Sequence, residues 1–265
     1  NSANNNNNNE PPPPEGVPVL GSYSHDISKV AFEWIGHQER KITPTEADRR
    51  LAELRMAYPS EVTYALQNLI DSHDTDRAVS KIINPDRTYD SGNREQDDPT
   101  YDGSRPGPEA YRRLKLLALL QMTYVGAPMI YYGDEVGMWG SDDPNNRKPM
   151  LWQDLEPYEE PEENRVSTDV LAHYRKVIAL RRDHPALRTG AFETVTTDDR
   201  ADVWSFKRSD DRETLLVMLN AGETDAPMTL PEGRWVPLFP VAGEAPDPRN
   251  VTVPGLAGRV WIERQ

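Results

Sequence analysis

The chain contains no cysteine among its 265 residues, so it can form neither a disulfide nor a thiolate metal site. This absence leaves a cytoplasmic and an exported bacterial location both open, because exported bacterial proteins can also lack cysteine. No apolar stretch approaches the roughly 20 residues that a membrane-spanning helix needs, and the first residues show no signal-peptide pattern. We therefore expect a soluble protein that has no membrane partner.

Basic residues are in the minority. The 30 lysines and arginines face 44 aspartates and glutamates, which gives a formal net charge of −14. A protein that binds the phosphate backbone needs a surplus of positive charge, so this balance argues against a nucleic-acid partner. Neutral ligands such as sugars remain compatible with the composition, and so does a homo-oligomer.

The five histidines are too scattered along the chain to form a pair at metal-ligand spacing. A glycine-rich phosphate loop and the Gly-x-Ser-x-Gly elbow of many hydrolases are also absent. Acidic loops are abundant, so a bound calcium ion stays open, but no EF-hand-like ligand spacing indicates one. We expect no cofactor to be required. The histidines are His25, His37, His73, His173 and His184.

The most informative stretch is a short apolar run, residues 65–70, that stops at a cluster of polar side chains. This pattern is typical of a buried strand that ends in a working loop. In α/β folds, ligand-binding residues collect where parallel strands end, which makes His73 and Asp74 site candidates. An ordinary polar turn is the alternative, because a His-Asp pair also arises by chance. The cluster consists of Asp71, Ser72, His73, Asp74, Asp76 and Arg77.

Several other elements can be predicted from local patterns. Residues 17–24 predict a short strand, and the spacing of apolar residues over 27–35 predicts an amphipathic helix. The string Thr43-Pro-Thr-Glu46 is a capping box with proline at the first helical position, so a second helix begins there. A last helix follows Ser167 and ends near Asp183, because a proline two residues later restricts the backbone before it.

A parallel βαβ unit is predicted in the middle of the chain. The strand at residues 65–70 is followed by a buried helix from 108 to about 125, and a second apolar strand covers 126–133. The polar stretch between residues 77 and 108 is long for a compact domain. We expect it to lie as a loop over a binding cleft.

The string Gln67-Asn-Leu-Ile-Asp-Ser-His-Asp-Thr-Asp-Arg77 resembles the fourth signature segment of the α-amylase superfamily, glycoside hydrolase family 13. In that family the end of barrel strand seven carries a His-Asp pair. The flanking residues look most like the branch of neopullulanase, cyclomaltodextrinase and maltogenic amylase. The resemblance implies that His73 hydrogen-bonds a sugar hydroxyl and that Asp74 clamps the ring hydroxyls and stabilises the transition state. Residues 126–135, with Gly-x-Pro-x-x-Tyr-Tyr-Gly-x-Glu, are similar to the strand-eight signature.

A third segment, Asp143-Pro-Asn-Asn-Arg147-Lys-Pro-Met, is similar to one found in the same branch. The resemblance implies that Asp143 and Arg147 hold a glucose unit on the non-reducing side of the cleaved bond. On spacing alone, the two side chains could equally form a local ion pair that contributes little at a surface. Trp139 and Trp152 flank the segment, and we expect each to pack rather than to stack on a sugar.

Three parts of the chain follow from these patterns. Residues 1–16 are an Asn/Pro-rich leader, which we expect to be disordered or extended. Residues 17–190 contain about three strand-helix units, whereas a complete barrel takes roughly 250 residues. We therefore expect an α/β fold that is the C-terminal part of a (β/α)8 TIM barrel, about strands 6–8. Residues 191–265 hold short β-rich runs and are expected to form a small all-β sandwich domain. The runs are 203–207, 214–219, 234–239 and 259–263.

Retaining glycoside hydrolysis needs a nucleophile and an acid/base carboxylate roughly 5 Å apart. In the family that this chain resembles, they follow strands four and five, the first within a Gly-x-Arg-x-Asp segment. Residues 92–96 match that segment by chance with glutamine at the nucleophile position, and Glu33 has the spacing of an ordinary helix residue. We expect this chain alone to be inactive and to need a missing N-terminal half of the barrel as partner. Exposed strand edges would otherwise favour aggregation.

These expectations lead to one main hypothesis for function. The chain would be the C-terminal part of an α-glucan-active glycoside hydrolase, which cleaves α-1,4 or α-1,6 glucosidic bonds in cyclodextrins, pullulan or maltooligosaccharides with retention. A non-catalytic carbohydrate-binding or scaffold remnant of the same fold is one alternative. A transglycosylase or isomerase of the same superfamily is another, and the exclusion of water from the site decides between these reactions.

Overall fold

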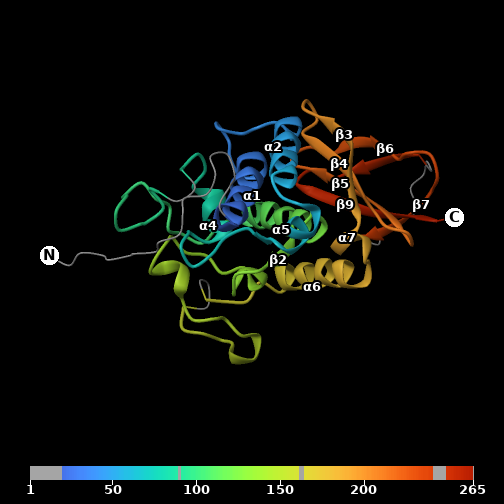
Figure 1. The fold of residues 1–265 in the computed structure, drawn as a ribbon. Helices are drawn as coiled ribbons and strands as arrows, with labels where there is room; N and C mark the ends of the chain where they lie inside the picture. Colours follow the sequence, from blue (N-terminus) through green and yellow to red (C-terminus); the bar gives the residue numbers. More distant parts are fainter. Residues whose placement is uncertain (1–19, 89–90, 161–163, 241–248, 265) are drawn as a thin grey trace.

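The computed structural model describes residues 20–88, 91–160, 164–240 and 249–264 (Figure 1). The leader at residues 1–16 lies outside the described residues. Helices gather in one half of the molecule and antiparallel strands in the other (Figure 1). No helix in the described part of the chain is both long and apolar enough to cross a membrane.

The first helix begins earlier than the sequence suggests. α1 spans Leu20–Ile35, so the strand predicted at residues 17–24 is wrong for residues 20–24, which are helical. Residues 17–19 lie outside the described residues. The apolar face at Ile27, Val30 and Trp34 is buried and holds the helix in place. Extending an existing helix by about two turns requires no new nucleus, whereas a strand without a pairing partner is not stable.

The predicted helix start at Thr43 is confirmed, but of the two capping-box bonds only the one made by the threonine is present. α2 spans Pro44–Met56, and the hydroxyl of Thr43 accepts a hydrogen bond from the Glu46 N–H at 3.2 Å. The Glu46 carboxylate turns outward and pairs with two arginines of the same helix, Arg49 and Arg50. The first turn is therefore fixed by the threonine alone, with proline at the first helical position.

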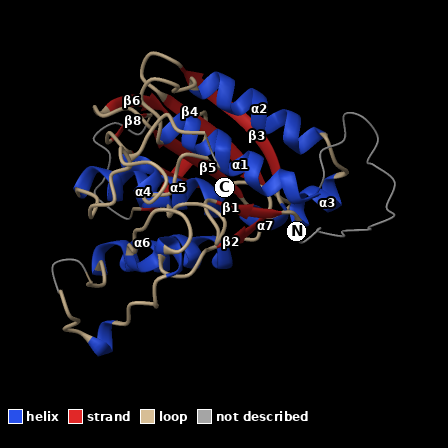
Figure 2. Cartoon of the chain, turned by 90° about the vertical axis from the view of Figure 1, so that its left-hand side faces the viewer, coloured by secondary structure: helices blue, strands red, loops and turns tan. Residues whose placement is uncertain are grey.

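The predicted parallel βαβ unit is confirmed. β1 (Gln67–Leu69) pairs with β2 (Ala127–Met129) in parallel, and α5 (Pro108–Thr123) connects them and is buried along most of its length. In Figure 2 the two strands lie side by side between α1 and α6. Asn68 and Gln121 exchange side-chain hydrogen bonds with each other's backbone carbonyls at 3.1 and 2.9 Å. This exchange fixes the strand against the connecting helix.

Three short helices were not predicted. α3 spans Ser60–Ala65, α4 spans Ala78–Ile83 and α7 spans Ala186–Thr189. α4 lies within the stretch that was expected to be a loop, because the apolar residues Val79 and Ile82 are buried against the core. A helix of one or two turns is held by its tertiary contacts and leaves little periodicity in the sequence.

The described residues between β2 and the last long helix, 130–160 and 164–167, are irregular. They contain three short 3-10 turns, and then α6 spans Thr168–Asp183, which ends where the sequence predicted. Ser167 occupies the position before the helix, as predicted, but its hydroxyl makes no capping hydrogen bond. The 3-10 turns are η1 (Asp134–Val136), η2 (Asn145–Arg147) and η3 (Gln153–Leu155).

Every strand in the described residues after 190 pairs in an antiparallel way. Five strands form one sheet in the order β3-β4-β5-β9-β7, and two more pair as β6-β8. The predicted runs correspond to β4, β5, β7 and β9, whereas β3, β6 and β8 were missed because they are more exposed or very short. Their bounds are β3 Ala191–Asp198, β4 Val203–Ser209, β5 Thr214–Asn220, β6 Ala226–Thr229, β7 Arg234–Phe239, β8 Asn250–Val253 and β9 Ala257–Arg264.

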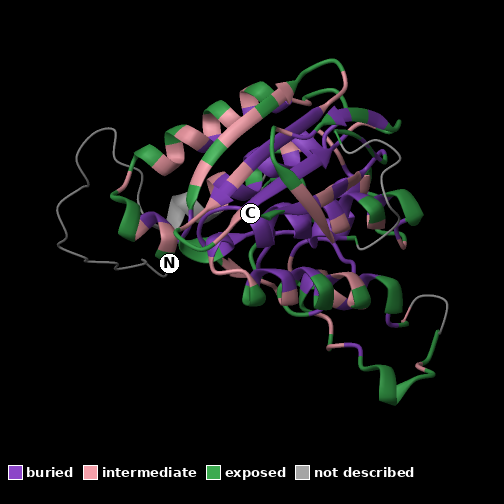
Figure 3. Ribbon diagram, turned by 90° about the vertical axis from the view of Figure 1, so that its right-hand side faces the viewer, coloured by how far each residue is buried: buried purple, intermediate pink, exposed green. Residues whose placement is uncertain are grey.

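One hydrophobic core joins the helices to the five-stranded sheet (Figure 3). Trp34 of α1 is fully buried, its indole N–H donates to Asp202 at 2.8 Å, and its ring meets Trp204 of β4 edge to face at 5.6 Å. Arg208 of β4 is also buried and donates to the Thr123 carbonyl of α5 at 2.7 Å. The strand-rich part therefore stabilises the helices that position β1 and β2.

We predict that Trp34→Phe lowers the free energy of unfolding by about 2 kcal/mol, because it removes buried ring volume and the indole N–H that donates to Asp202, which then keeps its ion pair with Lys41. Urea denaturation of the purified chain measures this. Trp152→Phe is the matched control, since Trp152 is 54% exposed and the same change there should alter stability by less than about 0.5 kcal/mol. Equal effects of the two substitutions would contradict the assigned packing.

Candidate active site

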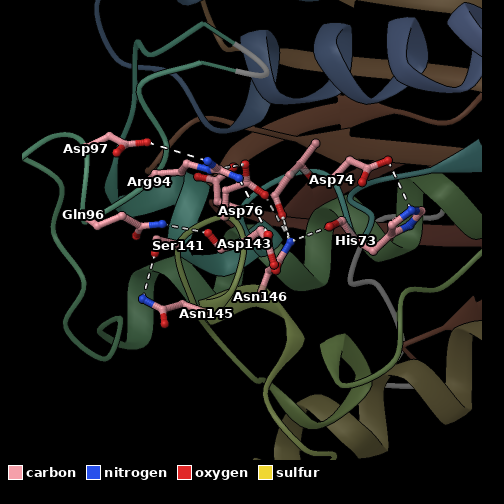
Figure 4. Close-up of polar contacts among 12 residues, drawn as sticks. His73, Asp74, Asp76, Arg94, Gln96, Asp97, Ser141, Asp143, Asn145 and Asn146 are labelled. Atoms are coloured by element: carbon pink, nitrogen blue, oxygen red, sulfur yellow. Dashed lines mark hydrogen bonds and ion pairs between the residues drawn. The ribbon is translucent and has the colours of Figure 1, made fainter. Parts of the chain in front are cut away.

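The loop that follows β1 turns two side chains outward. The Ser72 N–H donates to the Thr75 hydroxyl at 3.1 Å, and the Asp74 N–H donates to the Ser72 hydroxyl at 3.2 Å. These bonds satisfy the backbone within the loop and leave the side chains of His73 and Asp74 64% and 61% exposed. His73 Nε2 lies 3.2 Å from Asp74 Oδ2. Both candidates therefore stand at the end of the strand, with their polar atoms available to a ligand (Figure 4).

The loop after β2 brings the other two candidates to the same place. Arg147 Nη2 lies 3.6 Å from Asp74 Oδ1 and donates to the His73 carbonyl at 2.9 Å. Arg147 Nε lies 3.3 Å from Asp143 Oδ1, so the local ion pair is present as well. The two pairs of candidate residues, His73–Asp74 and Asp143–Arg147, are far apart in sequence and meet on one exposed surface. The guanidinium of Arg147 is the group that joins the two carboxylates.

Asn146 holds this arrangement from below, and nothing in the sequence marked it. Its side chain is fully buried, and its amide donates to the carbonyls of His73 and Thr75 at 3.0 and 2.8 Å (Figure 4). A buried amide that satisfies two carbonyls of another loop fixes the distance between the two loops. The side chains of His73 and Asp74 are thereby set relative to Asp143 and Arg147.

The stretch at residues 84–107 borders the site along its other side. Arg94 lies 3.5 Å from the carboxylate of Asp142 and 3.8 Å from that of Asp143, and the Gln96 amide donates to the Asp143 carbonyl at 2.8 Å. Residues 92–96 were interpreted above as a chance match to the Gly-x-Arg-x-Asp segment. In the structure they supply a cation and an amide beside Asp143. Neither Arg94 nor Gln96 carried any sequence signal for this place.

A buried ion pair anchors that stretch to the strand-end loop. Lys81 Nζ of α4 lies 2.6 Å from Asp76 Oδ1, and the Tyr101 hydroxyl donates to Asp76 Oδ2 at 3.0 Å. Burial, with the negative Asp76 beside it, raises the pKa of the Tyr101 phenol well above its usual value, so the phenol stays neutral and remains a donor. Asp76 thus has a structural role, although the sequence placed it among the ligand-binding side chains.

Asp71 and Arg77 differ from the sequence expectation in the same way. Both are buried, together with Asp134 of η1, beneath the exposed pair. Asp71 Oδ2 accepts the Ala78 N–H at 2.8 Å, and Arg77 Nη1 lies 3.4 Å from Asp134 Oδ1. Burial raises the pKa of Asp71 and, more strongly, that of Asp134, whose carboxyl is also repelled by Asp71. These charged groups support the loop from inside.

The remaining candidates divide by burial. Trp139 is 5% exposed and packs, as expected, but Trp152 is exposed, so the packing expectation does not hold there. Glu33 pairs with Arg50 at 2.6 Å on the outside of the helices, as an ordinary helix residue would. Across the described ranges, no three His, Asp or Glu side chains are grouped to hold a metal ion.

The surface formed by His73, Asp74, Asp143 and Arg147 suits a neutral polyhydroxylated ligand. Two carboxylates supply acceptors, the guanidinium supplies donors, and the imidazole can do either. Sugar hydroxyls both donate and accept hydrogen bonds, so they match such a mixed set of polar groups.

Comparison with known proteins shows which family the chain is similar to. The family model for the alpha-amylase catalytic domain matches residues 29–190. A cyclomaltodextrinase of Bacillus sp. is 36% identical over 170 residues, which are 63% of this chain and 24% of that protein. Neopullulanase 2 of Thermoactinomyces vulgaris is 35% identical over 177 residues, 66% of this chain and 24% of that protein.

A solved structure, the type III pullulan hydrolase from Thermococcus kodakarensis, superposes with a TM-score of 0.67 at 26% identity. The match covers 92% of this chain and 36% of that one. The chain spans about a quarter of the length of the two curated relatives. Because the family model matches more than half of the chain, the chain belongs to the α-amylase family of glycoside hydrolases.

Proposed function

We propose that this chain supplies the transition-state-stabilising and sugar-binding part of the active site of an α-glucan hydrolase that retains configuration. The convergence of His73, Asp74, Asp143 and Arg147 on one exposed surface carries the proposal. The substrates would be cyclodextrins, pullulan or maltooligosaccharides, with α-1,4 or α-1,6 bonds. The similarity to a cyclomaltodextrinase and a neopullulanase supports this class of substrate.

Asp74 would stabilise the transition state. Cleavage of a glycosidic bond builds positive charge on the sugar ring, and a carboxylate that is already in place lowers the energy of that charge. His73, 3.2 Å from Asp74, would hydrogen-bond a neighbouring hydroxyl and help to orient the ring. Arg147 contacts both Asp74 and Asp143, so it would keep the two carboxylates at a fixed separation while Asp143 binds an adjacent glucose unit.

The fold that we propose is partial. β1 and β2 would be the seventh and eighth strands of a (β/α)8 barrel, and α1 the helix after the sixth, so residues 17–190 form the C-terminal part of the barrel. Two parallel strands cannot close a barrel by themselves. Residues 191–265 would form the β-sandwich domain, which is supported by the apolar cluster of Leu216, Met228 and Val253, drawn from both antiparallel sheets.

We infer that the nucleophile and the acid/base carboxylate come from a separate N-terminal half of the barrel. The two mechanistic carboxylates of a retaining enzyme must lie on either side of the scissile bond, roughly 5 Å apart. The roles proposed above already assign Asp74 to the transition state and Asp143 to an adjacent glucose unit, and both carboxylates contact Arg147. The N-terminal half, or a second copy of the chain, would also cover the open edges of β1 and β2.

We predict that the purified chain releases no reducing sugar from β-cyclodextrin or pullulan, and that the same residues joined to or mixed with the N-terminal half do. A reducing-sugar assay on both preparations measures this. Hydrolysis at an enzymatic rate by the chain alone would contradict the partial-barrel proposal. Binding of maltooligosaccharide by the complete protein without any turnover would point to a carbohydrate-binding remnant, and linear or branched products of higher mass would point to transglycosylation.

In the complete protein, Asp74→Asn should lower kcat by about three orders of magnitude or more and change KM little, because the lost charge acts on the transition state and not on the bound substrate. Steady-state kinetics on a chromogenic maltooligosaccharide measures both constants. Asp154→Asn is the matched control, since Asp154 is exposed in η3 and should leave both constants unchanged. An Asp74→Asn enzyme with the parent kcat would remove Asp74 from the site.

A further inference from the structure

Two buried carboxyls lie under the exposed site, one at the end of each parallel strand. Asp71 follows β1 and is 1% exposed, and Asp134 follows β2 and is 3% exposed. Arg77 is fully buried, pairs with Asp134 at 3.4 Å and also acts as a positive charge on Asp71. Two carboxylates and one guanidinium would leave a net negative charge in a place that water does not reach. An uncompensated buried charge is costly, so one of the groups must change its ionisation.

The hydrogen bonds indicate where a proton sits. Asp71 Oδ2 accepts the Ala78 N–H, and the other oxygen, Oδ1, has no donor among the described side chains and backbone groups when both carboxyls are ionised. The Asp71 and Asp134 side chains are nevertheless close enough to hydrogen-bond each other. Two carboxyls can do this only if one of them carries a proton. A single proton satisfies the free oxygen and brings the cluster to zero net charge.

The charged and titratable groups around the pair favour the same state. Asp76 faces Asp71 and Glu135 faces Asp134, and both negative charges make loss of the proton harder. From α6, the phenol of Tyr174 is fully buried, and desolvation raises its pKa, so it stays neutral. Tyr131, whose pKa burial raises to about 12, is neutral as well. Among the described residues, Arg77 is therefore the positive charge that acts on both carboxyls.

We propose that Asp71 and Asp134 share one proton, and that this shared proton fastens the His73–Asp74 loop to the segment after β2, which makes both residues positioning residues for Asp74. The shared proton rests on the burial of both carboxyls beside Arg77 and on the Asp71 oxygen that lacks a donor. The positioning role rests in addition on the function proposed above for Asp74.

The path of the backbone explains why this link positions the site. Asp71 precedes the loop and bonds the Ala78 N–H that follows it, so one carboxyl closes both ends. Arg77, at the end of the loop, donates its N–H to the Gly140 carbonyl at 3.0 Å. Asp134 and Gly140 belong to the segment that continues to Arg147. If the proton is lost, two adjacent carboxylates repel each other and push the two loops apart.

The shared proton has a measurable linkage to folding. In the unfolded chain both aspartates ionise with pKa values of about 4, whereas the folded pair keeps one proton above that pH. The folding equilibrium constant should therefore fall by about tenfold per pH unit from about pH 4 upward, until the pair itself titrates. Burial lowers the pKa of His37 and of His173, the latter to about 4. These two histidines therefore make the folded state more stable as the pH rises to about 6.5, which is the opposite direction.

The test compares the chain with its Asp134→Asn variant, so that the histidine contributions cancel. Asparagine keeps the shape, donates its amide to Asp71 Oδ1 and has no proton to lose. Urea denaturation across pH should show the tenfold fall per pH unit in the parent relative to the variant. Infrared spectra at neutral pH should show a protonated carboxyl band in the parent that the variant lacks. Asp211→Asn, at a residue whose side chain is 88% exposed, should keep both parent properties.

If Asp134→Asn does not fold, Asp71→Asn tests the same change in net charge, because it also leaves a single carboxylate beside Arg77. A variant with the parent slope and the parent infrared band would overturn the shared proton. In the complete enzyme, Asp134→Asn should move the alkaline decline of kcat to higher pH, and an unchanged profile would overturn the positioning role. A complete protein without glycosidase activity would instead reject the proposed function, while the folding measurement would still decide on the proton.

Discussion

The parallel pairing of β1 with β2 is the constraint on which the rest of the structure depends. Because both strands run the same way and pair in register from Gln67–Ala127 to Leu69–Met129, the residues that follow them emerge at the same edge. Only three residues of each strand pair, so the register needs support from elsewhere. The reciprocal amide bonds of Asn68 and Gln121 supply it, and they are buried where water does not compete for them.

The sequence predicts those features that local chemistry decides, and it fails where tertiary contacts decide. A few neighbouring residues are enough to predict that Thr43 caps its helix. The same holds for His73 and Asp74, which follow the end of a strand. The start of α1 and the existence of α4 depend on what they pack against, which no short window contains. The same reason separates Asp74 from Asp71: both are aspartates in one polar run, yet the first is exposed and the second is buried against Arg77 and Asp134.

Asn146 shows most clearly which site residues cannot be predicted from the sequence. A motif comparison draws attention to Asp143 and Arg147, the residues that bear charge, whereas the amide between them determines how the two loops meet. The role of Asn146 depends on two backbone carbonyls that lie more than seventy positions away in the chain. A side chain whose partners are backbone atoms of another loop has no complementary residue type to search for. Such residues become visible only when the loops are placed in space.

The exposure of Asp74 has a consequence for the proposed chemistry. At about 4 Å, two unit charges interact by about 1 kcal/mol in bulk water and by about 4 kcal/mol at the effective dielectric near a protein surface. With 61% of its side chain exposed, Asp74 in this chain is close to the weaker limit. A carboxylate can stabilise a sugar cation strongly only after water is displaced from around it. The geometry of the four residues thus provides orientation, and whatever covers them in the complete enzyme must provide the low dielectric that gives the orientation its catalytic strength.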